Sequence, residues 1–209
     1  MISQDEIKKI INKNQTTQLN IRREYLQHLF LSYFYKQPQT EAIYFKGGTA
    51  LRVIYQSPRF SEDLDFSTGN DITTIENVII QTLTEIEKTG VNTQLKEAKK
   101  TSGGYLAAVV FDFLGQTISI LLQISLRQGK QKGEVVTIVS DFILPYIVIS
   151  LSRQQLIDEK MQALLSRQKP RDFYDLYFIL RSNLLLPEKK AILSKALKIL
   201  QDSDLNFEK

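Results

Sequence analysis

The sequence contains no cysteine, and it has a single histidine, His28. The absence of cysteine excludes disulfides, thiolate zinc sites, iron–sulfur clusters and cysteine nucleophiles. His28 lies in the aromatic segment YLQHLFLSYFY, where we expect a packed or partly exposed helix residue. Catalysis by a Ser-His-Asp set, or by a zinc ion held by several histidines, therefore has little support.

Long apolar segments are also missing. No apolar run approaches the ~20 residues that a membrane-spanning helix needs, and the longest candidate, residues 142–151, contains Pro145. The N-terminal sequence MISQDEIKKI lacks the charged-then-apolar layout of a secretory signal. We therefore expect a cytoplasmic protein that does not associate with a membrane.

The side chains that remain favour the chemistry of carboxylates, lysine, arginine, tyrosine and hydroxyls. The 209 residues are 43% hydrophobic and 24% charged, which is ordinary for a soluble globular protein of one large or two small domains. Oxygen ligands favour hard cations such as Mg²⁺ or Mn²⁺. The net charge of +4 permits a polyanionic partner but does not require one.

The hydrophobic pattern predicts an α+β protein, with helices first, then a mixed core, then helices again. Apolar periodicity and cap residues predict helices at residues 3–13, 17–36, 49–55, 75–87, 152–168 and 170–182, and a last one from Pro187. Short apolar and β-branched runs predict strands at residues 42–45, 64–67, 105–113, 117–127, 134–139 and 146–151.

One segment, residues 45–66, carries the clearest chemical signal: FKGGTALRVIYQSPRFSEDLDF. Residues two apart in a strand point to the same face, about 6.5–7 Å apart, so Asp63 and Asp65 project together. Two carboxylates this close repel each other unless a cation lies between them. Mg²⁺ usually takes one or two carboxylates plus substrate phosphates. The spacing therefore predicts that Asp63 and Asp65 bind Mg²⁺ or Mn²⁺.

The glycine turn before these acids predicts an anion site. Gly47 and Gly48 let the backbone approach a ligand closely, and a helix that begins near Thr49 offers free N–H groups and a positive dipole end. Thr49 adds a hydroxyl. Each feature alone is compatible with a solvated turn. Together they fit a triphosphate held between glycine turn and metal, the arrangement that phosphoryl or nucleotidyl transfer needs.

The Gly-Gly-Thr turn followed by Asp-x-Asp resembles the first motif of the polymerase-β-type nucleotidyltransferase fold. The longer string KGGTALR…RFSEDLDF resembles the nucleotidyltransferase toxins of the AbiEii/AbiGii type, from type IV toxin–antitoxin systems. The resemblance implies a small mixed sheet with flanking helices and helical layers at both ends. It divides the chain into N-terminal helices at 1–40, the nucleotidyltransferase core at 41–151, and a C-terminal helical region at 152–209 that completes the active site.

A second segment, residues 158–177 (DEKMQALLSRQKPRDFYDLY), matches the downstream motif of the same family. The resemblance implies that Lys160 acts at the phosphates of the nucleotide. It also implies an acid that activates the attacking group or orients the lysine, and the sequence leaves open whether this is Asp172 or Asp175.

Helix geometry adds to this second motif. At about 100° per residue, Lys160 and Arg167 lie about 20° short of two full turns apart and share one face. An alternative role for Arg167, Arg171 and Asp172 is a salt-bridge network that joins two helices. We expect Leu165, Tyr174 and Tyr177 to pack toward the core.

The sequence departs from the family at one position. Enzymes of this fold commonly place a third carboxylate on a neighbouring strand, and in SILLQISLR that position holds Gln123. Asp112 is the nearest alternative acid. The third ligand is therefore missing or comes from elsewhere, which weakens a strict two-metal mechanism.

These observations predict a metal-dependent nucleotidyltransferase that moves a nucleoside monophosphate from an NTP to an acceptor hydroxyl. The NTP phosphates are expected at Gly47, Gly48 and Thr49, where Lys46, Arg52 and Arg59 either touch phosphate or acceptor or remain solvated. Lys160 and Arg167 are expected to stabilise the charge that develops on the phosphates.

The resemblance suggests RNA, in particular tRNA, as the acceptor, and a toxin of a phage-defence system with a cognate antitoxin. Neither the acceptor nor toxicity follows from the residues themselves. Two alternatives remain open: nucleotidylation of a protein side chain, and a catalytically degenerate regulator that binds nucleotide, which Gln123 motivates.

Overall fold

The computed structural model describes residues 2–127, 129, 131–182, 195 and 198. The chain forms two compact units, Met1–Ser152 and Arg153–Lys209. Within the described part of the chain, no helix is both long and apolar enough to cross a membrane. The helix expected from Pro187 lies outside the described residues.

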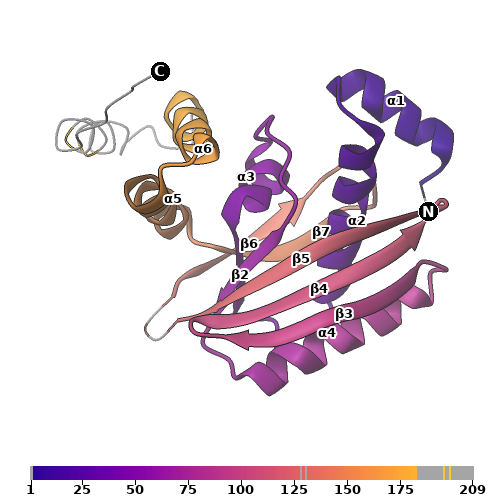
Figure 1. Cartoon of the computed structure of the whole chain (residues 1–209), viewed down its shortest axis with the longest axis horizontal. Helices are drawn as coiled ribbons and strands as arrows, with labels where there is room; N and C mark the ends of the chain where they lie inside the picture. Colours follow the sequence, from indigo (N-terminus) through magenta and orange to yellow (C-terminus); the bar gives the residue numbers. More distant parts are fainter. Residues whose placement is uncertain (1, 128, 130, 183–194, 196–197, 199–209) are drawn as a thin grey trace. The chain divides into compact units, whose positions relative to one another are not determined.

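The first unit is built on a mixed sheet, which has seven strands in the described part of the chain, in the order β3-β4-β5-β2-β1-β7-β6 (Figure 1). The pairs β2/β5 and β1/β7 are parallel and the other neighbours are antiparallel. The strands are β1 Ile43–Lys46, β2 Leu64–Thr68, β3 Asn92–Thr101, β4 Gly104–Phe113, β5 Gln116–Leu126, β6 Gly133–Ile138 and β7 Tyr146–Leu151.

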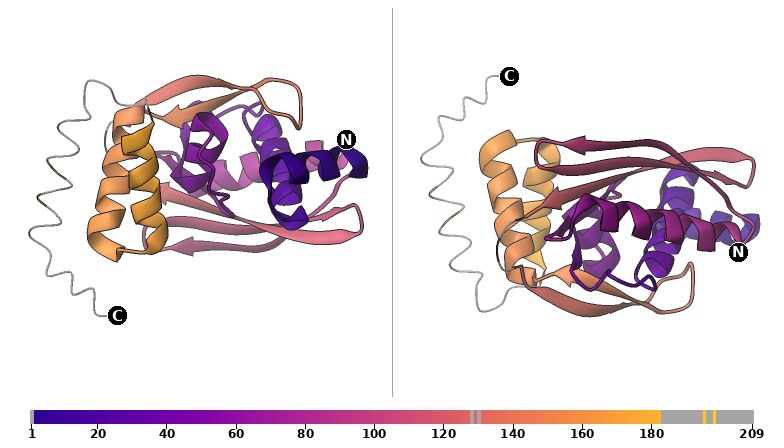
Figure 2. Two further views of the ribbon diagram at one scale, coloured as in Figure 1. Left: turned by 90° about the horizontal axis from the view of Figure 1, so that it is seen from above. Right: turned by 90° about the horizontal axis from the view of Figure 1, so that it is seen from below.

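Helices of the first unit begin at capping residues that the sequence supplies. Ser3 and Glu6 form a capping box at the start of α1, and Thr17 and Asp71 cap α2 and α4. The four helices of this part are α1 Gln4–Asn14, α2 Gln18–Phe34, α3 Gly47–Tyr55 and α4 Ile72–Glu87. In the two views of Figure 2, the β3–β4–β5 end of the sheet and the β6–β7 hairpin lie on opposite sides of α2.

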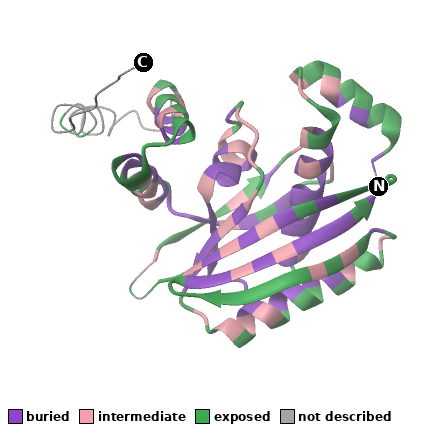
Figure 3. Ribbon diagram, in the orientation of Figure 1, coloured by how far each residue is buried: buried purple, intermediate pink, exposed green. Residues whose placement is uncertain are grey.

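The core lies between α2 and the apolar face of the central strands. Phe66 of β2 contacts Phe34 of α2 and Phe45 of β1, with ring centroids 5.0 and 5.6 Å apart. Figure 3 shows α2 and the central strands as largely buried. Because side chains alternate along a strand, residues next to Phe45 and Phe66 in sequence project from the other face. That second face carries the polar residues considered below.

In the second unit, helices α5 Arg153–Arg167 and α6 Pro170–Arg181 pack against each other. Gln168 adopts a left-handed conformation (φ 49°) and ends α5, and Pro170 occupies the first turn of α6. Met161 and Leu164 of α5 are buried, as expected. Leu165, Tyr174 and Tyr177 are instead 48%, 38% and 55% exposed, so their expected place in the core is wrong.

The α+β fold class is confirmed, with two differences in detail. Helix α3 begins at Gly47 and not at Thr49, so both glycines belong to its first turn. Strand β3, NTQLKEAKKT, was not expected because most of its residues are polar and exposed. It forms because it pairs along its length with β4, at the edge of the sheet. Lysines are a common means of protecting such an edge from aggregation.

Candidate functional site

A row of polar side chains crosses three adjacent strands of the first unit. Lys46 of β1 is the register partner of Asp65 in β2, and Asp65 is in turn the partner of Gln123 in β5. Register partners project from the same face, with neighbouring strands about 4.8 Å apart. The three side chains therefore stand side by side on the face opposite the Phe45–Phe66 contact. Lys46 is buried, and Asp65 and Gln123 are half-buried.

Asp63 joins this row from the residue just before β2. Its Oδ2 accepts a hydrogen bond of 3.0 Å from Nε2 of Gln123. Its backbone carbonyl accepts a hydrogen bond from the Thr49 hydroxyl, and Thr49 is fully buried. The Thr49 hydroxyl thus fastens the start of β2 to α3. The predicted contact of Thr49 with phosphate stays a prediction.

The two glycines bring side chains of the β2 segment against the N-terminus of α3. Gly47 has φ +82°, and a Cβ there would lie 2.0 Å from Oδ2 of Asp65. A Cβ on Gly48 would lie 2.4 Å from a guanidinium nitrogen of Arg59 and 2.9 Å from the Ser61 hydroxyl. The positive φ and the contact with Asp65 favour glycine at 47, whereas a side chain at 48 would require Arg59 and Ser61 to move. The first-turn N–H groups of a helix have no partner within the helix. In α3 this first turn lies beside the carboxylate of Asp65 and the guanidinium of Arg59.

The loop that joins α3 to β2 is held from α2. Nε2 of Gln27 donates to the backbone carbonyls of Ser61 and Glu62, at 3.0 Å each. These two residues directly precede Asp63. A single buried amide therefore fixes the backbone that leads into the Asp63–Asp65 pair.

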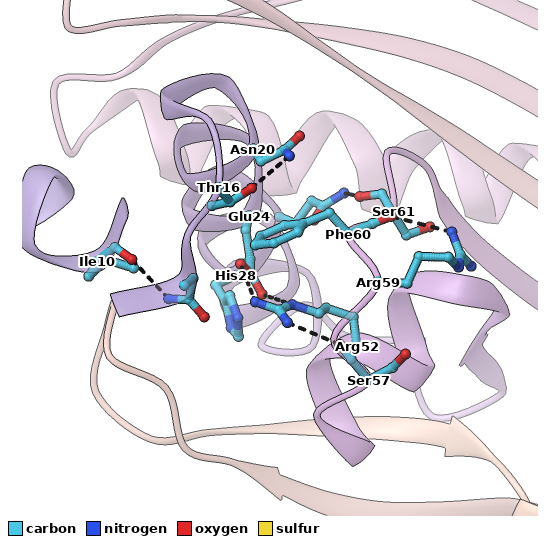
Figure 4. Close-up of polar contacts among 12 residues, drawn as sticks. Ile10, Thr16, Asn20, Glu24, His28, Arg52, Ser57, Arg59, Phe60 and Ser61 are labelled. Carbon is cyan, nitrogen blue, oxygen red and sulfur yellow. Dashed lines mark hydrogen bonds and ion pairs between the residues drawn. The ribbon is translucent and has the colours of Figure 1, made fainter. Parts of the chain in front are cut away.

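Arg52 of α3 is committed to the same support (Figure 4). Its guanidinium pairs with both carboxylate oxygens of Glu24, at 2.7 and 3.1 Å, and donates to the carbonyl of Ser57 at 3.0 Å. It also lies over the ring of Phe60, 4.1 Å from the centroid. A bidentate pair with this geometry positions a loop well. We therefore assign Arg52 to the support of the loop and not to phosphate.

His28 is a packed helix residue, as expected from the sequence. It is buried, and its Nδ1 lies 2.7 Å from the hydroxyl of Tyr146. Burial, assisted by the charge of Arg52, lowers the pKa of His28 to about 4. The imidazole is therefore neutral at physiological pH, which does not suit a general acid.

The second unit brings its own predicted residues together in two ion pairs. Nζ of Lys160 lies 2.7 Å from Oδ2 of Asp175, and both side chains are buried. Arg167 donates to both carboxylate oxygens of Asp172, with contacts between 2.6 and 3.1 Å. The two pairs separate the two candidate acids, because Asp175 accompanies the lysine and Asp172 accompanies the arginine.

Asp172 has the properties of a structural tie between α5 and α6. Burial raises the pKa of its carboxyl, but hydrogen bonds from Arg167 and from the Lys169 backbone N–H outweigh that effect, so the pKa is lowered. The carboxylate is fully buried and ionised, and its donors lie at the end of α5 and at the N-cap of α6. This arrangement is the salt-bridge network considered from the sequence.

The donor set suits a single hard cation. Among the residues that the structure describes, no group of three or more His, Asp or Glu could hold a metal ion. Asp112 accepts a hydrogen bond from the Thr117 hydroxyl at 2.7 Å. On β4, Asp112 stands six residues from Leu106, the register partner of Gln123, which is about 20 Å along the strand. The prediction of Asp112 as an alternative third ligand is therefore wrong. Two carboxylates on one face still match what Mg²⁺ takes together with substrate phosphates.

Comparison with known proteins identifies the family. Residues 29–206 match the family model for the nucleotidyl transferase AbiEii toxin of type IV toxin–antitoxin systems. The chain belongs to the AbiEii family. It is accordingly a nucleotidyltransferase, and the resemblance seen in its motifs is confirmed.

Solved structures show the same fold at low sequence identity. The nucleotidyltransferase toxin MenT4 from Mycobacterium tuberculosis H37Rv matches with a TM-score of 0.72 and 16% identity, over 97% of this chain and 72% of MenT4. JHP933 from Helicobacter pylori matches with a TM-score of 0.57 and 22% identity, over 90% of this chain and 83% of JHP933. A comparison with curated proteins finds no match.

Sequence reasoning missed the residues that support the site. Gln27 and Glu24 lie in α2, far along the chain from the loop and the arginine that they hold. The available signal was the presence of polar residues within an otherwise apolar helix. Both are buried, and buried polar groups are nearly always hydrogen-bonded.

Proposed function

We propose that this AbiEii-family chain transfers a nucleoside monophosphate from an NTP to an acceptor hydroxyl, with a divalent cation bound at Asp63 and Asp65. One observation carries the proposal: the N-terminus of α3 lies directly against Asp65 through Gly47 and against Arg59 through Gly48. Helix N–H groups and a guanidinium attract phosphate, and carboxylates attract the metal that accompanies it. A nucleotidyltransferase needs both at one place.

Each residue of the first unit has a role in this proposal. Backbone N–H groups of Gly47, Gly48 and Thr49 bind the β- and γ-phosphates, and Arg59 donates to them. Lys46, the register partner of Asp65, limits the charge of the carboxylate pair. Asp63 and Asp65 would hold Mg²⁺ or Mn²⁺, which when bound neutralises phosphate charge and orients the α-phosphate.

The second unit contributes the basic groups. We assign Lys160 to the developing charge on the phosphates, with Asp175 orienting its ammonium group or accepting the proton of the attacking hydroxyl. Arg167 and Asp172 hold α5 and α6 in register and set the position of Lys160. The division into N-terminal helices at 1–40, a nucleotidyltransferase core at 41–151 and a C-terminal helical region at 152–209 that completes the active site stays a prediction from the family resemblance.

We further propose that the acceptor is RNA, with tRNA as the first candidate, and that the protein acts in the cytoplasm as a toxin. The family description implies a cognate antitoxin. The relation to MenT4, a nucleotidyltransferase toxin, supports the toxic role through shared fold. Modification of a protein side chain uses the same site and differs only in the acceptor. A regulator without catalysis is the other alternative, because an amide stands where an acid is common.

A transfer assay separates these possibilities. The purified full chain is incubated with each of the four α-labelled NTPs, Mg²⁺, total RNA and cell protein, beside an EDTA control and Asp65→Asn. Asp112→Asn is the matched variant, because it makes the same chemical change at the far end of β4. Label in an RNA band, lost with EDTA and Asp65→Asn but kept with Asp112→Asn, is the expected result.

The other outcomes are equally clear. Label in a protein band alone would replace RNA by a protein acceptor. NTP binding without label in any acceptor would overturn the catalytic proposal in favour of the regulator.

A further inference from the structure

Gln123 of β5 lies next to both carboxylates of the proposed nucleotide site. It is the register partner of Asp65, and its Nε2 lies 3.0 Å from Oδ2 of Asp63. An ionised carboxylate only accepts hydrogen bonds, so the amide must present its NH₂ group to Asp63. The Gln123 side chain is half-buried, so its hydrogen bond with Asp63 remains partly accessible to solvent.

The amide has two physical consequences. A hydrogen bond to an ionised carboxylate is stronger than one between neutral groups, so it holds Asp63 in one rotamer. An acid at the same place would instead add a negative charge 3.0 Å from Asp63 and create a three-carboxylate cluster. Such a cluster has the charge to hold two divalent cations, whereas two carboxylates and an amide suit one.

We propose that Gln123 is a positioning residue that orients Asp63 for metal binding and limits the nucleotide site to one divalent cation. This inference rests on the proposed function, because it assigns the metal to Asp63 and Asp65. Gln123 acts through Asp63 and need not touch the nucleotide.

The strand tolerates the substitutions that test this role. Leu106, the register partner of Gln123 on the other side, is half-buried and apolar, so a leucine at 123 gains a packing partner there. Gln123→Leu removes the donor at similar size, and Gln123→Glu exchanges the donor for a third carboxylate. Gln94→Leu is the matched control, because Gln94 is an exposed glutamine on β3. Gln94 pairs with Val110 of β4, which pairs with Ser119 of β5, so its side chain projects from the same face of the sheet as Gln123.

The experiment measures Mn²⁺ binding by electron paramagnetic resonance on the full chain, with and without a non-hydrolysable NTP analogue. We expect one Mn²⁺ per wild-type chain. Gln123→Leu should weaken Mn²⁺ binding by about 10- to 100-fold, as is typical when a partner of a metal ligand is lost. Gln123→Glu should bind a second Mn²⁺. Gln94→Leu should match the wild type.

Steady-state transfer kinetics give an independent measure. Loss of orientation at Asp63 should lower kcat in Gln123→Leu by about 10- to 100-fold and leave the KM for NTP within about threefold, because the phosphates still bind at α3. Equal thermal unfolding midpoints would exclude a folding defect as the cause.

The failure of this inference is distinct from that of the proposed function. If wild type binds Mn²⁺ and transfers nucleotide, but the Gln123 variants match it, the role of Gln123 is overturned and the function stands. Two Mn²⁺ ions on the wild-type chain would also overturn it. If the wild type binds no Mn²⁺ even with nucleotide, both proposals fall together.

Discussion

The carboxylates of the two units lie in different surroundings. In the first unit, Asp63 accepts a hydrogen bond from the neutral amide of Gln123, and Asp65 lies against Gly47 at the N-terminus of α3. Asp175 and Asp172, in the second unit, are each paired with a cation, Lys160 and Arg167. Carboxylates beside a helix N-terminus suit a metal that accompanies phosphate, whereas a carboxylate paired with a lysine or arginine positions that cation. The comparison supports the proposal that the first unit binds the metal and that the second positions Lys160 and Arg167.

The largest loss of nucleotide transfer is expected when one carboxylate of the Asp63–Asp65 pair is neutralised. Asp65→Asn should lower nucleotide transfer by more than about 100-fold, because loss of a metal ligand costs more than the ~10- to 100-fold typical of its supporting residues. Initial rates with α-labelled NTP measure the change, with Asp112→Asn as the control. Retention of most activity in Asp65→Asn would break the proposed division between the units.

Gly47→Ala tests the contact between α3 and Asp65. The new Cβ would lie 2.0 Å from Oδ2 of Asp65 and must displace it, so we expect a loss of transfer of about 10- to 100-fold. Gly115→Ala is the matched control, since Gly115 also has positive φ (+73°) but no atom within 4 Å of its Cβ. Both variants should lose a similar ~1 kcal/mol of stability from backbone strain. Equal activity in the two variants would contradict the account.

Asp172→Asn tests the second unit through stability. The substitution leaves Arg167 without its buried carboxylate, and we expect a loss of about 2–3 kcal/mol in the free energy of unfolding. Urea denaturation followed by circular dichroism measures it. Asp158→Asn, on an exposed position of α5, should change stability by less than about 0.5 kcal/mol.

The same pair predicts a pH dependence. The pKa of Asp172 is lowered in the folded protein, so its contribution to stability is complete above the unfolded-state value near 3.8. It is lost as the pH falls below that value toward the folded pKa. Wild type should therefore lose more stability than Asp172→Asn between pH 5 and pH 3, when the urea midpoints are compared. Parallel curves for the two proteins would show that Asp172 is not held by charge.

The smallest effect is expected at the support of the loop. Gln27→Leu removes both hydrogen bonds to the carbonyls of Ser61 and Glu62 and keeps the apolar environment of α2. We expect kcat to fall by only about 3- to 10-fold, because Thr49 and the Glu24–Arg52 pair still hold neighbouring segments. Unchanged kcat would show that the loop is positioned without α2.

The local chemistry of the site could be predicted from sequence, but its long-range contacts could not. The two glycines predicted a close approach to the backbone at residues 47–48, and the Asp63–Asp65 spacing predicted two carboxylates on one face. In the structure, Asp65 lies against Gly47. The contact between Gln123 and Asp63 joins residues sixty positions apart, and only strand register brings them together. The sequence identified Gln123 as a missing acid, not as a hydrogen-bond donor.

Errors in the fold have a similar origin. Strand β3 lies at the edge of the sheet and carries few apolar residues. Its pairing with β4 determines its extended conformation, which the hydrophobic pattern of its own sequence does not predict. Tyr174 and Tyr177 were expected in the core, yet both are exposed on α6. Helical periodicity predicts that a helix has an apolar face. Which large side chains at the border of that face become buried depends on the elements that pack against the helix.

The most direct test of the central claim is a crystal structure with Mn²⁺ and a non-hydrolysable NTP, analysed by anomalous scattering. We predict one anomalous peak between the carboxylates of Asp63 and Asp65, with the β- and γ-phosphates at the N-terminus of α3 and Gln123 still donating to Asp63. A Mn²⁺ peak bound at Asp172 or Asp175, or phosphates placed away from Gly47 and Gly48, would contradict it.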